Sequence, residues 1–96
     1  MREVYRVIVD KNVIKKAKKH LKPAQRKKLA EFIEALKTNP YPKPPYDLKP
    51  VKGEKTKETN TYRFRIGEYR VFYTVYWDEK IIVVTDLKPR ETAYKR

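Results

Sequence analysis

The sequence predicts an α+β fold in the order β-α-α-β-β-β, with an N-terminal strand, a helical hairpin and a three-stranded antiparallel meander whose one face carries the helices. Three observations support this fold. A β-branched run occupies residues 4–9, two segments with helical spacing fill residues 10–36, and three apolar or alternating segments lie between residues 61 and 87. The length of 96 residues suits a single domain, which we expect to span residues 1–96.

The N-terminal part is expected to form one strand and two helices. Residues 4–9, Val-Tyr-Arg-Val-Ile-Val, are typical of a strand, and Asp10 can cap the helix that follows. Pro23 suits the first turn of the second helix. Apolar residues recur on one face of each helix, at Val13, Ile14, Ala17 and Leu21 in the first and at Leu29, Phe32, Ile33 and Leu36 in the second.

A proline-rich segment, residues 39–60, separates the helices from the later strands. Its prolines are expected to exclude regular structure. They are Pro40, Pro42, Pro44, Pro45 and Pro50. A connection of about 20 residues is unusual in so small a domain, and long loops are often functional or mobile. The alternative interpretation is a spacer that carries the chain from the second helix to the sheet.

The later strands are expected at residues 61–66, 69–77 and 81–87, and a tight hairpin sets their register. Residues 66–69, Ile-Gly-Glu-Tyr, place glycine at the first central position of a type II′ turn, which pairs Arg65 with Arg70. Side chains alternate across a strand, so two faces separate. The apolar face, expected to meet the helices, carries Tyr62, Phe64, Ile66, Tyr69, Val71, Tyr73 and Val75. The other face, called the basic face below, carries Arg63, Arg65, Arg70, Phe72 and Tyr76, and we expect its side chains to be exposed to solvent.

Charge narrows the class of partner. Lys and Arg number 25 against 12 Asp and Glu, for a net charge of +13, which favours nucleic acid, an acidic protein or an anionic membrane. A thermophile surface is the other source of so many charges, and the absence of cysteine agrees with it. Such a surface normally mixes the two signs, whereas bases here outnumber acids about two to one.

Several kinds of site and location are excluded or unsupported. The chain has no cysteine and a single histidine, His20, so thiolate metal sites, histidine metal sites and a two-histidine ribonuclease mechanism are excluded. We expect no metal and no other cofactor. No segment approaches the ~20 apolar residues of a membrane span. No membrane partner is therefore expected, and a cytoplasmic location is expected by default.

The basic face has the residues that an RNA phosphate requires. Arg65 opposite Arg70 is a repulsive pair, which an anionic ligand would neutralise, and the planar arginine fork matches a phosphate. The last strand ends beside Arg70, so we expect Lys88, Arg90 and Tyr94 over the same face, with Tyr94 free to stack on a base. The alternative is a set of solvated arginines on an exposed sheet.

Three other polar residues are weaker candidates. Glu68 is expected to be a solvated turn residue. Asp86 is either an orienting partner for Arg90 or a charge at a strand end. His20 is expected to interact with the last carbonyls of its helix.

Two segments resemble a known family. Residues 62–73, Tyr-Arg-Phe-Arg-Ile-Gly-Glu-Tyr-Arg-Val-Phe-Tyr, resemble the central signature of the RelE/ParE toxin superfamily. Residues 87–94, Leu-Lys-Pro-Arg-Glu-Thr-Ala-Tyr, resemble the closing motif of its RelE branch, especially of archaeal members. The resemblance implies a toxin of a type II toxin–antitoxin system, a ribosome-dependent endoribonuclease that cuts messenger RNA in the ribosomal A site. It also implies a cognate antitoxin that is RelB-like, small, acidic and helical.

The resemblance assigns roles by position. In the reaction that it implies, the ribose 2′-hydroxyl attacks the adjacent phosphate. Arg70 would stabilise that phosphate, Arg90 would assist with charge or the leaving group, and Tyr94 would stack on the base. RNA and phosphate binding is assigned to Arg63, Arg65, Lys88 and Phe72. Some members have lysines at positions 63 and 65, but an arginine stays protonated, so the proton acceptor is unassigned.

Two alternatives stay open. One is a ParE-like toxin that acts on a protein target, DNA gyrase. The other is a non-catalytic RNA-binding module with the same basic face.

Overall fold

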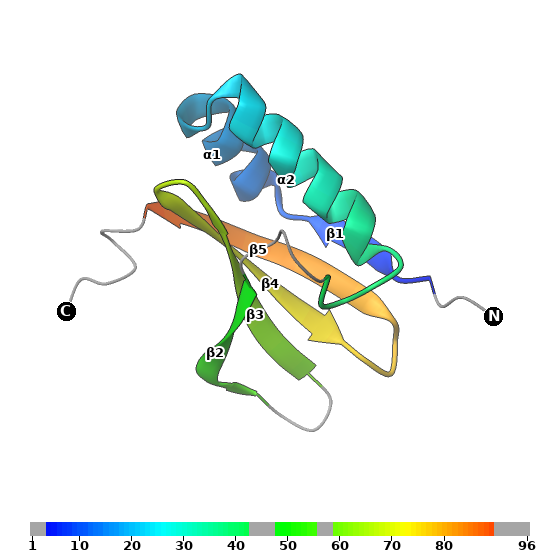
Figure 1. The fold of residues 1–96 in the computed structure, drawn as a ribbon. Helices are drawn as coiled ribbons and strands as arrows, with labels where there is room; N and C mark the ends of the chain where they lie inside the picture. Colours follow the sequence, from blue (N-terminus) through cyan, green and yellow to red (C-terminus); the bar gives the residue numbers. More distant parts are fainter. Residues whose placement is uncertain (1–3, 43–47, 56–58, 90–96) are drawn as a thin grey trace.

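The computed structural model describes residues 4–42, 48–55 and 59–89 (Figure 1). Its elements follow in the order β1 (Arg6–Val9), α1 (Lys11–His20), α2 (Pro23–Leu36), β2 (Leu48–Lys55), β3 (Thr59–Ile66), β4 (Tyr69–Tyr76) and β5 (Ile81–Pro89). The α+β class, the N-terminal strand, the helical hairpin and the closing meander are confirmed. The sheet, however, is larger than the sequence predicts.

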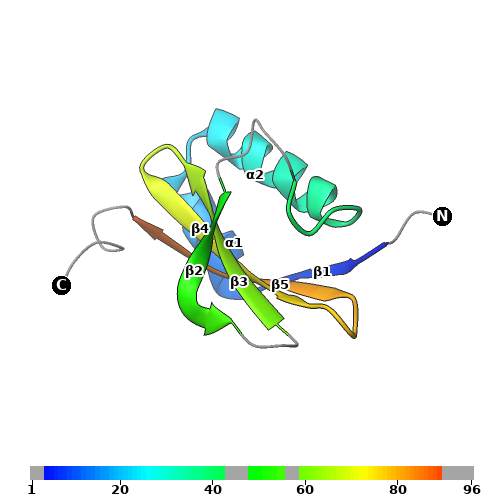
Figure 2. The ribbon, with the colours of Figure 1, turned by 60° about the horizontal axis from the view of Figure 1, so that its bottom comes forward.

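The sheet has five strands in the order β1-β5-β4-β3-β2. β1 runs parallel to β5, whereas all other neighbours are antiparallel. Both helices lie on one side of the twisted sheet, and within the described residues the other side carries no helix (Figures 1 and 2). This second side of the sheet is therefore the surface on which the basic side chains of the meander can meet a ligand.

The proline-rich segment contains a strand, so the expectation of irregular structure throughout residues 39–60 is wrong. β2 pairs with β3 and places Lys49 opposite Arg63 and Pro50 opposite Tyr62, before the register shifts. β2 is an edge strand, which needs ladder hydrogen bonds on one side only and therefore tolerates proline. Pro44 and Pro45 lie outside the described residues.

The hairpin between β3 and β4 has the predicted register. Ile66 pairs with Tyr69, and Arg65 pairs with Arg70. Gly67 has a φ of 56°, the left-handed region that the first central residue of a type II′ turn requires. A Cβ at this position would lie 2.5 Å from Nε2 of Gln25 in α2, so the turn also packs closely against the helix layer.

The helices begin at the predicted residues. The Asp10 side chain accepts a hydrogen bond of 2.8 Å from the Asn12 N–H, and Pro23 is the first residue of α2. The predicted apolar faces are buried or partly buried except at Ile14, whose side chain is 45% exposed. Ile14 lines an apolar hollow between the two helices, together with Val9 of β1 and Ile33 of α2.

An aromatic cluster joins the helices to the sheet. Phe32 of α2 stacks on Phe64 of β3 at 3.9 Å between ring centroids and meets Tyr73 of β4 edge-on at 5.5 Å. The three side chains have no exposed surface, and burying each phenylalanine contributes about 2–3 kcal/mol. The Tyr73 hydroxyl donates to the Pro40 carbonyl at 2.9 Å, and burial raises the pKa of this phenol well above its ordinary value. The cluster therefore fixes which face of β3 and β4 points away from the helices.

Candidate nucleic-acid interface

The face of the sheet away from the helices carries rows of side chains that run across the strands. Phe64, Val71 and Leu87 are buried on the helix side, so the alternating residues on each strand point to the opposite face. The cationic row consists of the cross-strand partners Arg65, Arg70 and Lys88. The mixed row, one pleat repeat further along, consists of Lys49, Arg63, Phe72 and Asp86. The predicted convergence of Arg63, Arg65, Arg70 and Phe72 on one face is confirmed.

A third set of side chains, the threonine group, adjoins the mixed row. It consists of Thr61, Thr74 and Thr85. Phe72 pairs with Asp86 but Tyr73 pairs with Val84, so Thr85 is the extra residue of a β-bulge. The bulge lets the Thr85 hydroxyl donate to the Phe72 carbonyl at 3.3 Å. It also brings Asp86 and Lys88 into line with the cations of β3 and β4.

Arg70 lies on the predicted face, but it is only 5% exposed, and the expectation that it is solvent-exposed is wrong. Arg70 stands in the middle strand of the meander, and its cross-strand neighbours Arg65 and Lys88 are both long side chains. Arg65 is exposed at the margin of the row, where its Nε donates to the Gly67 carbonyl at 3.3 Å. Arg65 and Lys88 are thus the accessible cations of the row.

Asp86 links the mixed row to α1. Its Oδ1 accepts hydrogen bonds from the Lys16 ammonium at 2.9 Å, the Asn12 amide at 3.2 Å and the Leu87 N–H at 2.8 Å. Its Oδ2 lies 3.9 Å from the Lys88 ammonium. Burial by itself raises the pKa of Asp86, but the Lys16 and Leu87 hydrogen bonds and the nearby ammonium charges outweigh burial and hold the pKa below its ordinary value. Asp86 is therefore a carboxylate at neutral pH.

Lys88 is held between two groups of the mixed row. Its ammonium lies 3.9 Å from Asp86 and 5.6 Å from the centroid of the Phe72 ring, within the range of a cation–π contact. The Lys88 side chain nevertheless remains 47% exposed, so its charge is available to a ligand.

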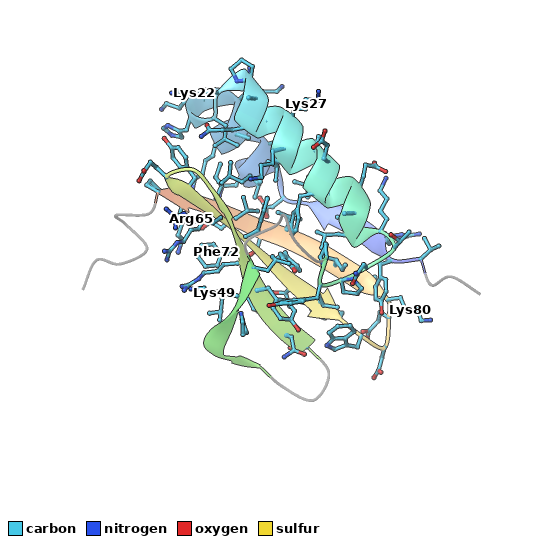
Figure 3. All side chains as sticks on the ribbon, in the orientation of Figure 1. Lys22, Lys27, Lys49, Arg65, Phe72 and Lys80 are labelled. Atoms are coloured by element: carbon cyan, nitrogen blue, oxygen red, sulfur yellow. The ribbon has the colours of Figure 1, made fainter. Side chains whose placement is uncertain are left out.

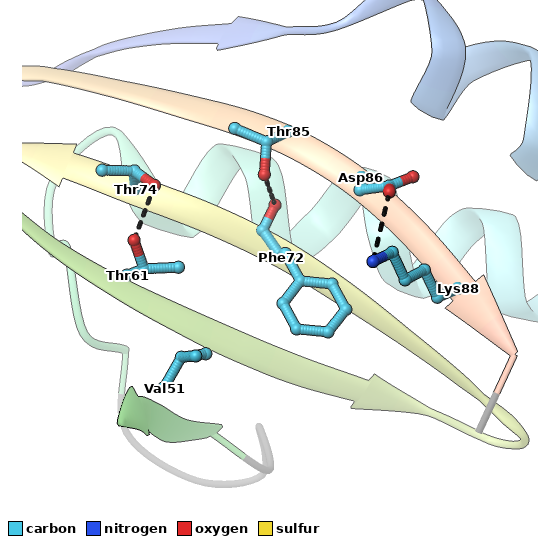
Figure 4. A pocket seen from close by; sticks show the side chains of 7 residues that line it. All are labelled: Val51, Thr61, Phe72, Thr74, Thr85, Asp86 and Lys88. Atoms are coloured by element: carbon cyan, nitrogen blue, oxygen red, sulfur yellow. Dashed lines mark hydrogen bonds and ion pairs between the residues drawn. The ribbon is translucent and has the colours of Figure 1, made fainter. Parts of the chain in front are cut away.

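A groove opens beside these residues (Figure 4). It has a volume of about 520 Å³ and is lined by Val51, Thr61, Phe72, Thr74, Thr85, Asp86 and Lys88. A second hollow of about 450 Å³ is lined by Lys49, Pro50, Val51 and Arg63. Val51 of β2 borders both, so the two hollows form adjacent parts of one concave surface.

The structure adds Lys49 to the basic face, which the sequence did not predict. Lys49 is exposed and lies directly opposite Arg63. Arg65, Phe72 and Lys49 follow one another along the sheet, whereas Lys22 and Lys27 lie on the helix layer (Figure 3). The alternation of Leu48, Lys49 and Pro50 is too short and too rich in proline to signal a strand without the partner strand β3.

The remaining residues that the sequence singled out lie outside the cationic and mixed rows or outside the described part of the chain. Arg90 and Tyr94 lie outside the described residues, and so does any contact between Asp86 and Arg90. Glu68 is exposed in the turn, as expected. The His20 ring stacks on Tyr69 with 6.0 Å between ring centroids. His20 is the last residue of α1, and its interaction with the last carbonyls of the helix stays a prediction.

Within residues 4–42, 48–55 and 59–89, no three histidine or acidic side chains lie close enough together to hold a metal ion. No helix in this part of the chain has the length and apolar character needed to cross a membrane.

Comparisons with known proteins give a consistent family. The family described as "ParE toxin of type II toxin-antitoxin system, parDE" matches residues 4–94. RelE1 of Methanocaldococcus jannaschii is 45% identical over 91 residues, which cover 95% of this chain and 96% of that protein. These matches extend over both the helical hairpin and the basic face.

Two solved structures share the fold. An archaeal RelE–RelB complex from Pyrococcus horikoshii OT3 contains a chain with a TM-score of 0.81 and 37% identity, covering 91% of this chain and 96% of that one. A RelB–RelE antitoxin–toxin complex from Methanococcus jannaschii contains a chain with a TM-score of 0.70 and 26% identity, covering 91% and 94%.

Proposed function

Since this chain belongs to the RelE/ParE family of type II toxin–antitoxin toxins, we propose that it is a ribosome-dependent endoribonuclease that cleaves messenger RNA in the ribosomal A site. The observation that carries the proposal is the cationic row, in which Arg65, Arg70 and Lys88 lie side by side on the face away from the helices. Adjacent cations on one face attract the negative charge of a phosphate, and the planar fork of an arginine matches the geometry of the phosphate oxygens.

The cationic row suits cleavage by a ribose 2′-hydroxyl. Attack on the adjacent phosphorus forms a bond to the 2′-oxygen, breaks the bond to the 5′-oxygen and concentrates negative charge on the phosphate oxygens. Arg70 is nearly buried, so its position is fixed before RNA binds, and fixed cations stabilise developing charge most effectively. We assign Arg63 and Arg65 to gripping the neighbouring phosphates, and Arg90 and Tyr94 to the leaving group and the base.

The proton acceptor is the reason to invoke the ribosome. Arginine cannot accept a proton at neutral pH, and the carboxylate of Asp86 is a weak base because its pKa is lowered. We therefore propose that the ribosome–message complex positions the 2′-hydroxyl or takes up its proton. Free RNA should then be bound but cut slowly.

An antitoxin partner follows from the same family. The relatives from P. horikoshii and M. jannaschii were solved as RelE–RelB complexes. We propose that this chain binds a RelB-like antitoxin, small, acidic and helical, whose charge complements the net charge of +13.

The experiment combines growth inhibition with mapping of cut sites on translated messages. The wild type, Arg65→Ala, Arg70→Ala and Arg70→Lys are each expressed from an inducible promoter, with Lys27→Ala on α2 as the control. We expect Arg65→Ala and Arg70→Ala to abolish cleavage and growth arrest, and Lys27→Ala to retain both. Because Arg70 is nearly buried, circular dichroism must show that its variants fold, and Arg70→Lys separates loss of charge from loss of structure.

The ribosome requirement is tested with purified components. Cleavage should be fast only when the message is being translated. Equally fast cleavage of naked RNA would contradict the proposed mechanism.

A ParE-like toxin that acts on DNA gyrase is the second candidate, because the matching family is described by its ParE members. That function predicts inhibition of supercoiling by the purified protein and intact translated messages. Either result distinguishes it from RNA cleavage.

A further inference from the structure

We propose that the groove bordered by Phe72 and the threonine group is a nucleobase subsite, which holds one unstacked base of single-stranded RNA while its phosphate lies on the cationic row. The inference rests on the proposed function and deepens it. It assigns a role to a cavity that the chemistry of cleavage does not require.

The spacing of the rows matches the parts of one nucleotide. Along β3 and β4, the cationic row, the mixed row and the threonine group follow at every second residue, about 7 Å apart, and the β-bulge brings Thr85 of β5 beside them. A phosphate on the cationic row thus leaves its base within reach of Phe72 and Thr74. The groove volume of about 520 Å³ falls within the ~300–1,000 Å³ typical of small-ligand sites.

Phe72 supplies a stacking surface at the right place. Its ring is half-buried, and its cross-strand partners are Arg63 on one side and Asp86 on the other. Aromatic rings that border a basic groove are the usual means of holding unpaired bases. The contact of the Lys88 ammonium with the same ring keeps a cation beside any base that stacks there.

The polar lining of the groove suits a neutral base edge better than a phosphate. The hydroxyls of Thr61 and Thr74 lie 2.9 Å apart and share one hydrogen bond, so one of their two protons remains available as a donor. The Thr85 proton is used by the Phe72 carbonyl, but its oxygen can still accept. The Asp86 carboxylate lines the same groove and repels a phosphate, whereas it can accept a hydrogen bond from an exocyclic amine.

The test compares two oligonucleotides by fluorescence anisotropy at low salt. One is a short single-stranded RNA of mixed sequence, and the other is the same sugar–phosphate chain with abasic riboses. Four full-length proteins are compared: the wild type, Phe72→Leu, Thr74→Val and Tyr76→Leu. Tyr76 is the matched control, because it is an exposed aromatic on the same face of β4 but does not line the groove.

We expect the wild type to prefer the base-bearing RNA roughly tenfold, as one base–aromatic stack provides. Phe72→Leu should lose most of this preference and keep its affinity for the abasic chain. Thr74→Val should reduce the preference for the base-bearing RNA by about twofold to fivefold. Tyr76→Leu should keep the wild-type preference.

The outcomes separate the two proposals. If Phe72→Leu and Thr74→Val keep the wild-type preference, the base lies elsewhere and the subsite is refuted while RNA binding stands. If the wild type shows no preference, the subsite is likewise refuted. If the wild type binds neither oligonucleotide, the proposed function fails and the subsite fails with it.

Discussion

The salt dependence of RNA binding follows from the number of accessible cations on the basic face. Lys49, Arg63, Arg65 and Lys88 are exposed or half-exposed there, whereas Arg70 is nearly buried. Each phosphate neutralised on a single strand lowers the slope of log K against log salt by about 0.7, so these four predict a slope of about −3. Raising the salt from about 50 to 200 mM should then weaken binding by roughly 50-fold.

Single variants test this number directly. Arg65→Ala or Lys49→Ala should each bring the slope to about −2, because one phosphate contact is lost. The assay is anisotropy of a fluorescent single-stranded RNA titrated at four or more salt concentrations. Lys27→Ala on α2 removes an exposed lysine from the helix layer and should leave the slope unchanged.

A slope near zero in the wild type would show that the basic face does not bind phosphates and would favour a protein target. An equal change in slope for Lys27→Ala would show that net charge, rather than the arrangement of the rows, determines binding.

Three further predictions concern stability, measured by urea unfolding. Gly67→Ala should lower the free energy of unfolding by about 1–3 kcal/mol, because the φ of Gly67 is positive and the new Cβ would displace the Gln25 side chain. Glu68→Ala in the same turn is the control and should change the stability little. Equal effects of the two substitutions would show that the turn is not tight. Tyr73→Phe should cost about 1 kcal/mol, because it removes a buried hydroxyl that donates to a loop carbonyl; a neutral result would mean that this carbonyl finds another donor. Asp86→Asn should cost up to about 1 kcal/mol at pH 7. The pKa of Asp86 is lower in the folded than in the unfolded protein, so its carboxylate contributes stability above the unfolded pKa of about 4. This contribution is lost as the pH falls through the folded pKa. If the difference in unfolding free energy between wild type and Asp86→Asn stays constant down to about pH 2, this assignment is contradicted.

The register of the basic face was predictable because it depends on neighbours in sequence. The Ile-Gly-Glu-Tyr turn sets which residues of β3 and β4 pair, and strict alternation then places Arg63, Arg65 and Arg70 on one face. The helix starts, marked by the Asp10 cap and by Pro23 in the first turn, were predictable for the same reason. Arg90 and Tyr94 remain predictions from resemblance, since they lie outside the described residues.

Other features depend on residues distant in the chain. β2 exists because β3 offers it a partner, so Lys49 joins the basic face through a contact that the local pattern around Pro50 does not signal. The link between Asp86 and Lys16 crosses 70 positions of sequence. The burial of Arg70 depends on what surrounds the middle strand, which a count of alternating residues cannot supply.

The sequence by itself thus determined the α+β class, the helix starts, the hairpin register and the sign of the charge on the face away from the helices. These properties follow from backbone geometry and side-chain type within a few residues. Only the tertiary structure decided which strands border that face, which of its cations are accessible, and where it is hollowed. Burial, edge pairing and cavity shape arise from packing between distant segments, and that packing is what turns a basic strand pair into a surface with a groove.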